Sequence, residues 1–381
     1  MPPKKDLTIT AETKARIHDI LQSEFGRQVE SIALQPGSNN TRYTGADLND
    51  AVQVQNEVGA YSLARIALAS LDVPVTPRIY GWHAVDMDTK APGWILQEFM
   101  RGAVLNDEAF GKLDRTAKDS VVADIARIFH LLQQYKLPAS VVGYGGLNFD
   151  DDGQVVTGPT AIHGATKACA TYHELYNEYL KTQLRRMDEC DVVQGWQDTS
   201  DMRARIDAFV ERGFQPLLER SIEANPRPVL IHGDLNMLNF LYDPETSRIT
   251  ALVDWSFSHV ASLSDEYFYS FPELFHIVVP EDPTSPANTI RQAILYGLDA
   301  VTNEDKAATP MADWTLIERT NAAFVAAGVT RPADLMPGID ALSDLYWFIQ
   351  NLSPGLFSCR VCGPEWGHSR SKPPNGTQKT L

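Results

Sequence analysis

Three oxygen-bearing side chains, Asp234, Asn239 and Asp254, have types and spacing that could carry out chemistry. Asp234 ends the triplet HGD, Asn239 comes five residues later, and Asp254 closes a second apolar run. Magnesium binds one or two carboxylate or amide oxygens and fills its other positions with waters and substrate phosphates. An aspartate apart from the metal can accept the proton of an attacking hydroxyl. Together these are the parts that phosphoryl transfer requires.

Each of the three residues also has an ordinary structural interpretation. Asp234 can cap a turn, Asn239 can cap a helix, and Asp254 can end a strand, because Asp and Asn are common at turns and caps. The combination of all three in this order and spacing favours the chemical interpretation.

Two apolar runs deliver these side chains. Residues 229–231 lead to HGD, and residues 249–253 lead to Asp254. The segment YDPETSR between them is a hairpin signal. We therefore expect the three side chains to lie at neighbouring strand ends.

The run HGDLNMLNFL followed by LVDW resembles the signature of the aminoglycoside phosphotransferase and choline kinase family, small-molecule relatives of the protein kinases. The kinase catalytic loop, in which an Asn follows the Asp of HRD by five residues, and the metal-binding DFG follow the same spacing logic. The resemblance implies Asp234 as catalytic base, with Asn239 and Asp254 as Mg²⁺ ligands. It also implies His232 as a structural residue that steadies the loop. Asp265, in SLSDEYFYSF, either matches a family aspartate that supports the loop or is a helix N-cap.

The resemblance extends over roughly residues 30–355 and implies an α+β fold of the two-lobed protein kinase-like type. A small β-containing N-lobe over residues 1–100 would bind ATP, and a larger, mainly helical C-lobe over 101–357 would carry the catalytic loop and the acceptor region. Residues 358–381 are rich in Pro, Gly, Ser and Lys and lack periodicity, which predicts a disordered tail.

The helix expected over residues 50–70 looks like the family helix whose glutamate orients a phosphate-binding cation, which would be Glu57. Simple packing at a helix edge is the alternative. The strand that bears this cation is absent, since TRYTGADLN is too short for two strands of about 5–6 residues each. No lysine lies between Lys14 and Lys90, and Arg42 is the cation in the right neighbourhood. Either a shortened gene product or a divergent lobe would account for this abbreviated N-lobe.

The run WILQEFMRGAVL looks like the last strand of the small lobe and the interlobe hinge. By this resemblance the backbone of Glu98, Phe99 and Met100 would meet the adenine edge of ATP. Leu241, two residues after Asn239, would form the floor of the adenine pocket. Ordinary core or edge packing is the alternative for each.

Periodicity predicts further elements along the chain. Helices are expected over residues 11–26, 117–135, 170–188 and 200–222 and in several segments up to about 352. Strands are expected over residues 29–34, 78–84 and 94–99, with a hairpin in GYGGLNFDDDGQVVTG that turns at Asp152-Gly153.

Composition is that of a globular protein. The 381 residues carry 33 Lys and Arg against 49 Asp and Glu, a net charge of −16, and 44 % are hydrophobic. This acidity disfavours a nucleic-acid partner. No apolar run approaches the ~20 residues of a membrane span, and MPPKKDLTIT has no apolar signal region. We therefore expect a cytoplasmic protein without a membrane partner, and its oligomeric state stays open.

The four cysteines are too sparse for a disulfide framework. Cys359 and Cys362 form a single CxxC followed by His368, but a structural zinc site needs four ligands. Two thiols in a loose tail are the favoured interpretation.

The sequence thus predicts an ATP- and Mg²⁺-dependent phosphotransferase that acts on a hydroxyl of a small molecule. The acidic surface would tolerate a cationic acceptor, but no residue identifies it. The main alternative is a non-catalytic or impaired nucleotide-binding protein, which the absent cation favours. A metal-dependent hydrolase is weaker, because His259 is the one further histidine close in sequence.

Overall fold

The computed structural model describes residues 11–26, 49–85, 93–189, 201–222, 224–270, 274, 287–299, 301–310 and 312–352. The chain forms two compact units, Met1–Tyr43 and Thr44–Leu381, and each is considered by itself.

Helix α1 (Ala11–Phe25) belongs to the first unit. Gly26 ends it with a φ of 60° and an N–H that donates to Gln22 O at 3.0 Å, which is a typical glycine cap. The helix expected here is confirmed. The strand expected over residues 29–34 and the short segment around Arg42 lie outside the described residues.

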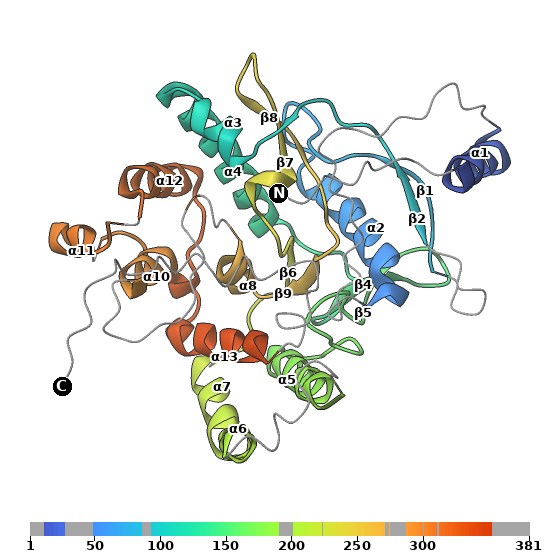
Figure 1. Cartoon of the computed structure of the whole chain (residues 1–381). Coiled ribbons are helices and arrows are strands. Elements are labelled where there is room, and N and C mark those ends of the chain that lie inside the picture. Colours follow the sequence, from blue (N-terminus) through green and yellow to red (C-terminus); the bar gives the residue numbers. More distant parts are fainter. Residues whose placement is uncertain are drawn as a thin grey trace, which may run out of the picture. The chain divides into compact units, whose positions relative to one another are not determined.

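In the second unit, helix α2 (Asp50–Ala67) packs against two paired strands, as Figure 1 shows. Strands β1 (Ile79–His83) and β2 (Trp94–Gln97) are antiparallel. The buried face of α2 carries Val58 and Tyr61, at the spacing of an amphipathic helix. The predicted helix over 50–70 and the two predicted strands are confirmed.

The described residues contain three further small antiparallel sheets. They are β3 (Ala103–Val104) with β7 (Phe240–Asp243) and β8 (Arg248–Leu252), β4 (Gly146–Phe149) with β5 (Val155–Gly158), and β6 (Val229–Ile231) with β9 (His259–Ala261). Gly145 and Val260 exchange N–H···O hydrogen bonds of 3.0 and 2.7 Å, which join the β4–β5 hairpin to β9. The hairpin predicted around Asp152-Gly153 is confirmed.

The pairing around the predicted turn YDPETSR involves a strand that the sequence analysis does not name. The turn joins β7 to β8, with Leu241 opposite Ala251, because the residues directly before a short turn are the ones that can fold back on those after it. The apolar run before HGD is β6, which pairs with β9 instead. The His232 ring links the two sheets, with Nε2 3.1 Å from Val253 O.

The other described helices follow in chain order. They are α3 (Asp107–Lys112), α4 (Arg115–Gln134), α5 (Tyr172–Glu189), α6 (Met202–Phe209), α7 (Gln215–Ser221), α8 (Leu263–Tyr269), α10 (Ala287–Tyr296), α11 (Asn303–Ala308), α12 (Trp314–Ala327) and α13 (Ile339–Asn351). A π-helical turn, Val210–Phe214, joins α6 to α7. The helices predicted over 117–135, 170–188 and 200–222 are confirmed as α4, α5 and the α6–α7 pair.

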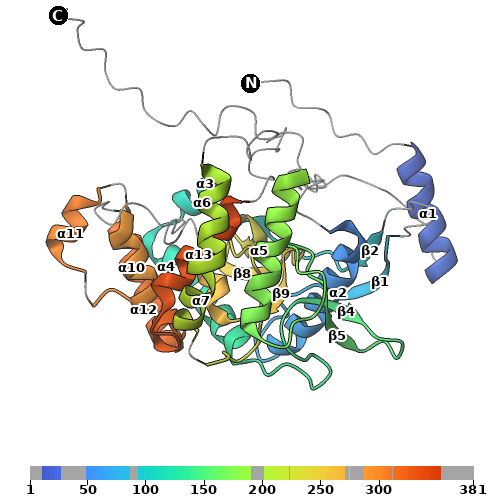
Figure 2. The ribbon, with the colours of Figure 1, turned by 90° about the horizontal axis from the view of Figure 1, so that it is seen from below.

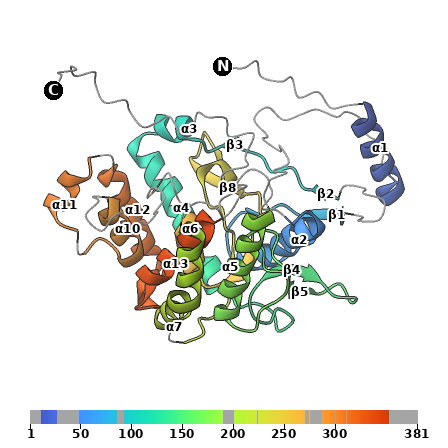
Figure 3. The ribbon, with the colours of Figure 1, turned by 60° about the horizontal axis from the view of Figure 1, so that its bottom comes forward.

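Most of these helices, though not α11, contribute residues to one buried core. α4 lies along α12, where the His130 ring is 2.9 Å from Gly328 O, and α13 packs against α5 and α7 (Figures 2 and 3). The same cluster of buried apolar residues includes β6 and both flanking helices α4 and α8. The core therefore supports the segment that leads into HGD from several sides.

The expected α+β class is confirmed, with small antiparallel sheets in a chain that is mainly helical after β3. Among the described helices, none combines the length and apolar character that a membrane crossing needs. The predicted tail from residue 358, with Cys359, Cys362 and His368, lies outside the described residues.

Candidate active site

The loop after β6 turns sharply to present Asp234. Gly233 has a φ of 81°, in the left-handed region that glycine tolerates. A Cβ at this position would lie 2.6 Å from Phe257 O, so a side chain does not fit. The glycine of HGD is therefore required by the backbone and by the close approach of the next loop.

Asp234 is partly buried, and two amides bind its carboxylate. Asn236 Nδ2 donates to Oδ1 at 2.7 Å, and Asn239 Nδ2 donates to Oδ2 at 3.0 Å. Burial disfavours the charged form and raises the pKa of Asp234 to about 6. The charge of Asp254 also raises this pKa, whereas the two hydrogen bonds lower it. The carboxylate is thus oriented and has a pKa near that of an efficient proton acceptor at neutral pH.

Asn239 lies at the end of a 3₁₀ turn, Met237–Asn239, that leads directly into β7. Its Nδ2 donates to Asp234 O at 2.8 Å as well as to the Asp234 carboxylate. Its backbone carbonyl accepts from Val253 N at 2.9 Å. Because the amide nitrogen is committed to Asp234, Oδ1 is the atom that Asn239 can offer to a cation.

Asp254 follows β8 in a left-handed conformation, with a φ of 61°. Its N–H donates to the Tyr61 hydroxyl at 3.2 Å, and Ser256 Oγ donates to its Oδ1 at 2.6 Å. The residue is exposed, so its second oxygen can reach a ligand. The residue before it, Val253, donates its N–H to Asn239 O at 2.9 Å, and the charge of Asp254 acts on the Asp234 carboxyl.

Glu266, on α8, binds the backbone of the HGD loop and was not singled out from the sequence. Its carboxylate accepts from His232 N at 2.7 Å and Gly233 N at 3.0 Å, and Ser270 Oγ donates to it at 2.5 Å. Ser270 Oγ also accepts from Leu235 N at 3.1 Å. Burial raises the pKa of Glu266 to about 7. One carboxylate and one hydroxyl thus bind three N–H groups of the loop.

Asp265 does not make these contacts to the loop. Its carboxylate accepts hydrogen bonds from the hydroxyls of Tyr172 and Tyr176 on α5, the second at 3.2 Å, and burial raises its pKa to about 7. The loop contact that the sequence analysis expected of Asp265 is made by Glu266. The N-cap of α8 is Ser262, so the alternative of an N-cap at Asp265 is wrong.

His232 is buried, and both of its ring nitrogens are occupied. Nε2 lies 3.1 Å from Val253 O, Nδ1 lies 3.3 Å from Asp234 N, and the ring lies 4.6 Å from that of Trp255. Burial lowers its pKa to about 4, so the ring is neutral at pH 7. These contacts join the ends of β6 and β8, which fits the predicted steadying role.

Glu57 lies on α2, one turn before Tyr61. Burial, followed by the charge of Asp254, raises its pKa to about 8. Among the described residues, no ion pair joins Glu57, Asp234 or Asp254 to a Lys or Arg. Arg42, the cation that the sequence places in this neighbourhood, lies outside them. With a pKa of about 8, Glu57 is mostly protonated at pH 7 and adds negative charge to the described site only as the pH rises above that value.

The predicted hinge follows β2 directly. Glu98 N–H donates to Arg78 O at 2.7 Å and is not available to a ligand, while the Phe99 side chain is 69 % exposed. Gly102, with a φ of 140°, follows the hinge, and a Cβ there would lie 3.1 Å from Leu241 Cβ. Since β3 pairs with β7 opposite Leu241, the hinge exit and the predicted pocket floor are adjacent.

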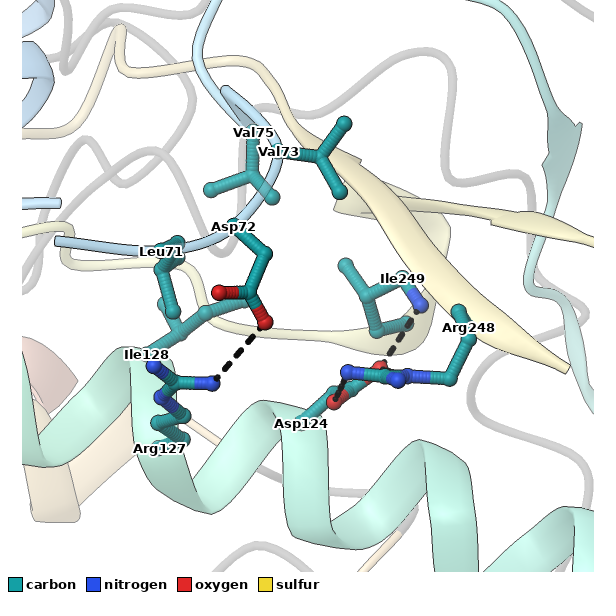
Figure 4. Close-up of a pocket in the computed structure, with 9 residues that line it drawn as sticks. All are labelled: Leu71, Asp72, Val73, Val75, Asp124, Arg127, Ile128, Arg248 and Ile249. Carbon is teal, nitrogen blue, oxygen red and sulfur yellow. Dashed lines mark hydrogen bonds and ion pairs between the residues drawn. The ribbon is translucent and has the colours of Figure 1, made fainter. Parts of the chain in front are cut away.

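A small cavity of about 30 Å³ lies at the far end of β8 from Asp254 (Figure 4). Its two arginines are both paired: Arg248 with Asp124 at 2.7 Å and Arg127 with Asp72 at 3.8 Å. Because the charges are paired and the volume fits only a few waters, we do not assign this cavity a ligand.

Residues 42–268 match the model of the phosphotransferase enzyme family, which is more than half of the chain and includes all the predicted site residues. None of the curated proteins matches the sequence.

The solved structures that resemble the chain include three phosphotransferases. The streptomycin–ATP ternary complex of APH(2")-IIa is 13 % identical, with 91 % of each chain covered and a TM-score of 0.44. The macrolide 2'-phosphotransferase MphH from Brachybacterium faecium is 14 % identical over 81 % of this chain and 76 % of its own, with a TM-score of 0.37. A thermostable mutant of APH(4)-Ia is 16 % identical over 88 % and 96 %, with a TM-score of 0.39.

Proposed function

This chain belongs to the phosphotransferase enzyme family, and on that premise we propose that it transfers the γ-phosphate of ATP, with Mg²⁺, to a hydroxyl of a small molecule. The observation that carries the proposal is the arrangement of three side chains. Asp234, Asn239 and Asp254 converge at the ends of β6, the 3₁₀ turn and β8, joined by the hydrogen bonds between Asn239 and Asp234.

Asp234 is the proposed general base. The acceptor oxygen forms a bond to the γ-phosphorus while the bond from that phosphorus to the β,γ-bridging oxygen breaks, and the acceptor proton passes to the Asp234 carboxylate. The two amides that bind this carboxylate fix its direction before the acceptor arrives. A pKa of about 6 leaves it mostly ionised at pH 7 yet more basic than an exposed aspartate.

The donor set of Asn239 Oδ1 and the Asp254 carboxylate fits Mg²⁺, a hard cation that prefers few protein oxygens. When bound, the ion supplies charge neutralisation across the phosphates. Asn239 keeps its oxygen available because its amide nitrogen is bound by Asp234. Asp254 keeps one carboxylate oxygen available because Ser256 binds the other.

For ATP we propose the hinge as the adenine contact. The Glu98 N–H is bound to Arg78 O, so the backbone groups of Phe99 and Met100 would contact the edge of the adenine base. Leu241 would form the floor of the adenine pocket. Glu57 would orient a cation on the phosphates. The proposed domains are an N-lobe over residues 1–100, a C-lobe over 101–357 and a tail over 358–381. The proposed location of the protein is the cytoplasm.

The test is acceptor-dependent release of ADP. The full chain is incubated with ATP, Mg²⁺ and a panel of hydroxylated metabolites that includes cationic amino alcohols and amino sugars. We expect ADP with at least one acceptor, no turnover for Asp234→Ala, and normal turnover for Asp151→Asn, an exposed hairpin residue. Absence of ADP with every acceptor and with water would count against the proposal.

One observation favours a second candidate, a nucleotide-binding protein without turnover. Glu57 has no Lys or Arg partner among the described residues, and a phosphate-gripping cation contributes to transfer. Thermal unfolding with and without Mg·ATP separates the two functions. Stabilisation by Mg·ATP with no ADP from any acceptor would support the binding protein.

A further inference from the structure

We propose that Tyr61 is a positioning residue, whose buried hydroxyl holds the backbone of Asp254 and thereby aims its carboxylate at the cation. The inference rests on the proposed function, because it concerns the predicted Mg²⁺ ligand. It adds a residue to which neither the spacing nor the family resemblance gives a role.

The first support is the placement of the hydroxyl. Tyr61 lies on α2 with 1 % of its surface exposed, and its ring lies 6.2 Å from that of Trp255. Its hydroxyl accepts from Asp254 N at 3.2 Å, and the Gln97 side chain also hydrogen-bonds it. One atom on α2 therefore contacts both the strand before the hinge and the backbone of the metal ligand.

The second support is the conformation of Asp254. Its φ of 61° is left-handed, a conformation that non-glycine residues adopt infrequently and that the surrounding contacts must support. Its neighbours in the chain, Val253 and Trp255, are held by Asn239 and by the core. The N–H of Asp254 itself is bound by Tyr61. Without that acceptor, the backbone is free to relax and to turn the carboxylate away.

The third support is a second contact of α2 at the other end of the same loop. Asn56 is fully buried, and its Nδ2 donates to Ser258 O at 2.7 Å while its Oδ1 accepts from Leu147 N at 2.8 Å. Tyr61 and Asn56 thus hold the first and last residues of the Asp254–Ser258 loop. Asn56 also ties the helix to β4, so its loss would disturb the fold, whereas Tyr61→Phe removes one oxygen.

Helix α2 thus contacts the Asp254–Ser258 loop through hydrogen bonds of two uncharged side chains, Tyr61 and Asn56. Within the described residues, no ion pair includes Glu57 on the same helix, so none there couples α2 to the loop. The Tyr61 hydroxyl provides that coupling through a hydrogen bond that needs no charge. A displacement of α2 would displace Asp254 through this bond.

The experiment compares three full-length proteins: the natural chain, Tyr61→Phe and Tyr144→Phe. Tyr144 is the matched control, since its buried hydroxyl donates to Pro226 O, away from the loop. Calorimetry measures the affinity for ATP with Mg²⁺ and for ATP in EDTA, and amide hydrogen exchange follows the peptide that contains Asp254.

We expect Tyr61→Phe to lower the Mg²⁺-dependent gain in ATP affinity about fivefold to tenfold, the scale of one lost hydrogen bond. Its affinity for ATP in EDTA should stay within about twofold, and exchange at Asp254 should accelerate. Tyr144→Phe should change neither. A Tyr61→Phe protein that keeps the Mg²⁺ gain, or loses affinity equally with and without Mg²⁺, would overturn the inference.

Failure of the proposed function gives a different result. If the natural chain binds no Mg·ATP, the proposed function is contradicted, and exchange at Asp254 decides the positioning role by itself. Faster exchange in Tyr61→Phe, but not in Tyr144→Phe, would support it, and equal exchange in all three proteins would overturn it.

Discussion

On the α8 side of the site an acid, Glu266, accepts the N–H groups of the loop that carries Asp234, whereas on the α2 side a neutral phenol, Tyr61, accepts the N–H of Asp254. The acid also binds Ser270 and therefore makes three hydrogen bonds, while the phenol is bound by Asp254 and Gln97. Above its pKa of about 7 Glu266 is ionised, and hydrogen bonds to a charged acceptor are about twice as strong as neutral ones. The loop of the proposed base is thus held more firmly than the loop of the proposed metal ligand.

This difference follows from the number of buried acids that the site already holds. Glu57, Asp234 and Glu266 all have pKa values raised by burial, to about 8, 6 and 7, with Asp254 beside the first two. A further acid in place of Tyr61 would add to this repulsion, whereas a phenol binds the Asp254 N–H without charge. The surplus of carboxylates is what a bound cation would relieve.

The largest effect should come from Asp234→Asn, which removes the base and leaves both sides of the site in place. We expect turnover to fall about 10²- to 10⁴-fold, with Mg·ATP affinity retained. In the natural protein, activity should fall as the pH drops through about 6, because protonated Asp234 cannot accept the acceptor proton. Steady-state kinetics of both proteins from about pH 5 to pH 8 measures the loss of turnover in Asp234→Asn and the fall in activity of the natural protein at low pH. This is roughly the range over which the base titrates. Full activity at the acid end would contradict the assignment.

The next largest effect should come from the α8 side. In Glu266→Gln one carboxylate oxygen becomes an NH₂ group that faces a backbone N–H. At about pH 8 the substitution also removes an acid whose charged form burial disfavours, which offsets part of this loss. We therefore expect a net loss of about 2 kcal/mol in the free energy of unfolding at pH 8. Urea unfolding measures this, with the exposed α7 variant Glu219→Gln as control. If Glu266→Gln were as stable as its control, the α8 side would not be the firmer one.

The α2 side should respond to pH through Glu57. Between its ordinary pKa of 4.5 and its raised value of about 8, the folded protein keeps a proton that the unfolded chain releases. The free energy of unfolding therefore falls as the pH rises through this window. Glu57→Gln cannot titrate, so in EDTA it should be more stable than the natural protein at pH 8 by roughly 1–3 kcal/mol, given 1.36 kcal/mol per pKa unit and incomplete burial.

Urea unfolding of both proteins at pH 5 and pH 8 (about the two ends of the window) gives the test for Glu57. The difference in free energy of unfolding between Glu57→Gln and the natural protein should be small at the acid end and should increase toward the basic end. Stability curves that run parallel across this range would show that Glu57 is not held protonated by the fold. Glu219→Gln is again the control, because its side chain is exposed.

The sequence predicts the residues whose spacing is local and misses those whose contacts are distant. Asp234 and Asn239 lie five residues apart in one loop, so their motif already specifies their contact. Glu266 could not be chosen over Asp265, because adjacent helix residues point about 100° apart and only the pairing of β6 with β9 decides which one faces the loop.

Tyr61 shows a second limit of sequence patterns. An aromatic residue at helical spacing indicates a buried face, which the structure confirms, but the pattern does not show what its hydroxyl binds. Its partner, Asp254, is 193 residues away. Likewise, β7 was not predicted because its four residues lie between a catalytic motif and a turn, where neither periodicity nor length marks a strand.

The smallest expected effect tests whether the α8 side depends on its acid alone. Ser270→Ala removes the acceptor of Leu235 N and one donor to Glu266, but leaves the bonds from His232 N and Gly233 N intact. We expect a loss of about 1 kcal/mol in the free energy of unfolding, with an unchanged Mg²⁺-dependent gain in ATP affinity. Ser62→Ala, which removes a hydroxyl bonded within α2 to Val58 O, is the control. Should Ser270→Ala weaken Mg·ATP binding as much as Tyr61→Phe does, the two sides would be coupled, and the firmer hold of the α8 side would have to be assigned to the whole loop network.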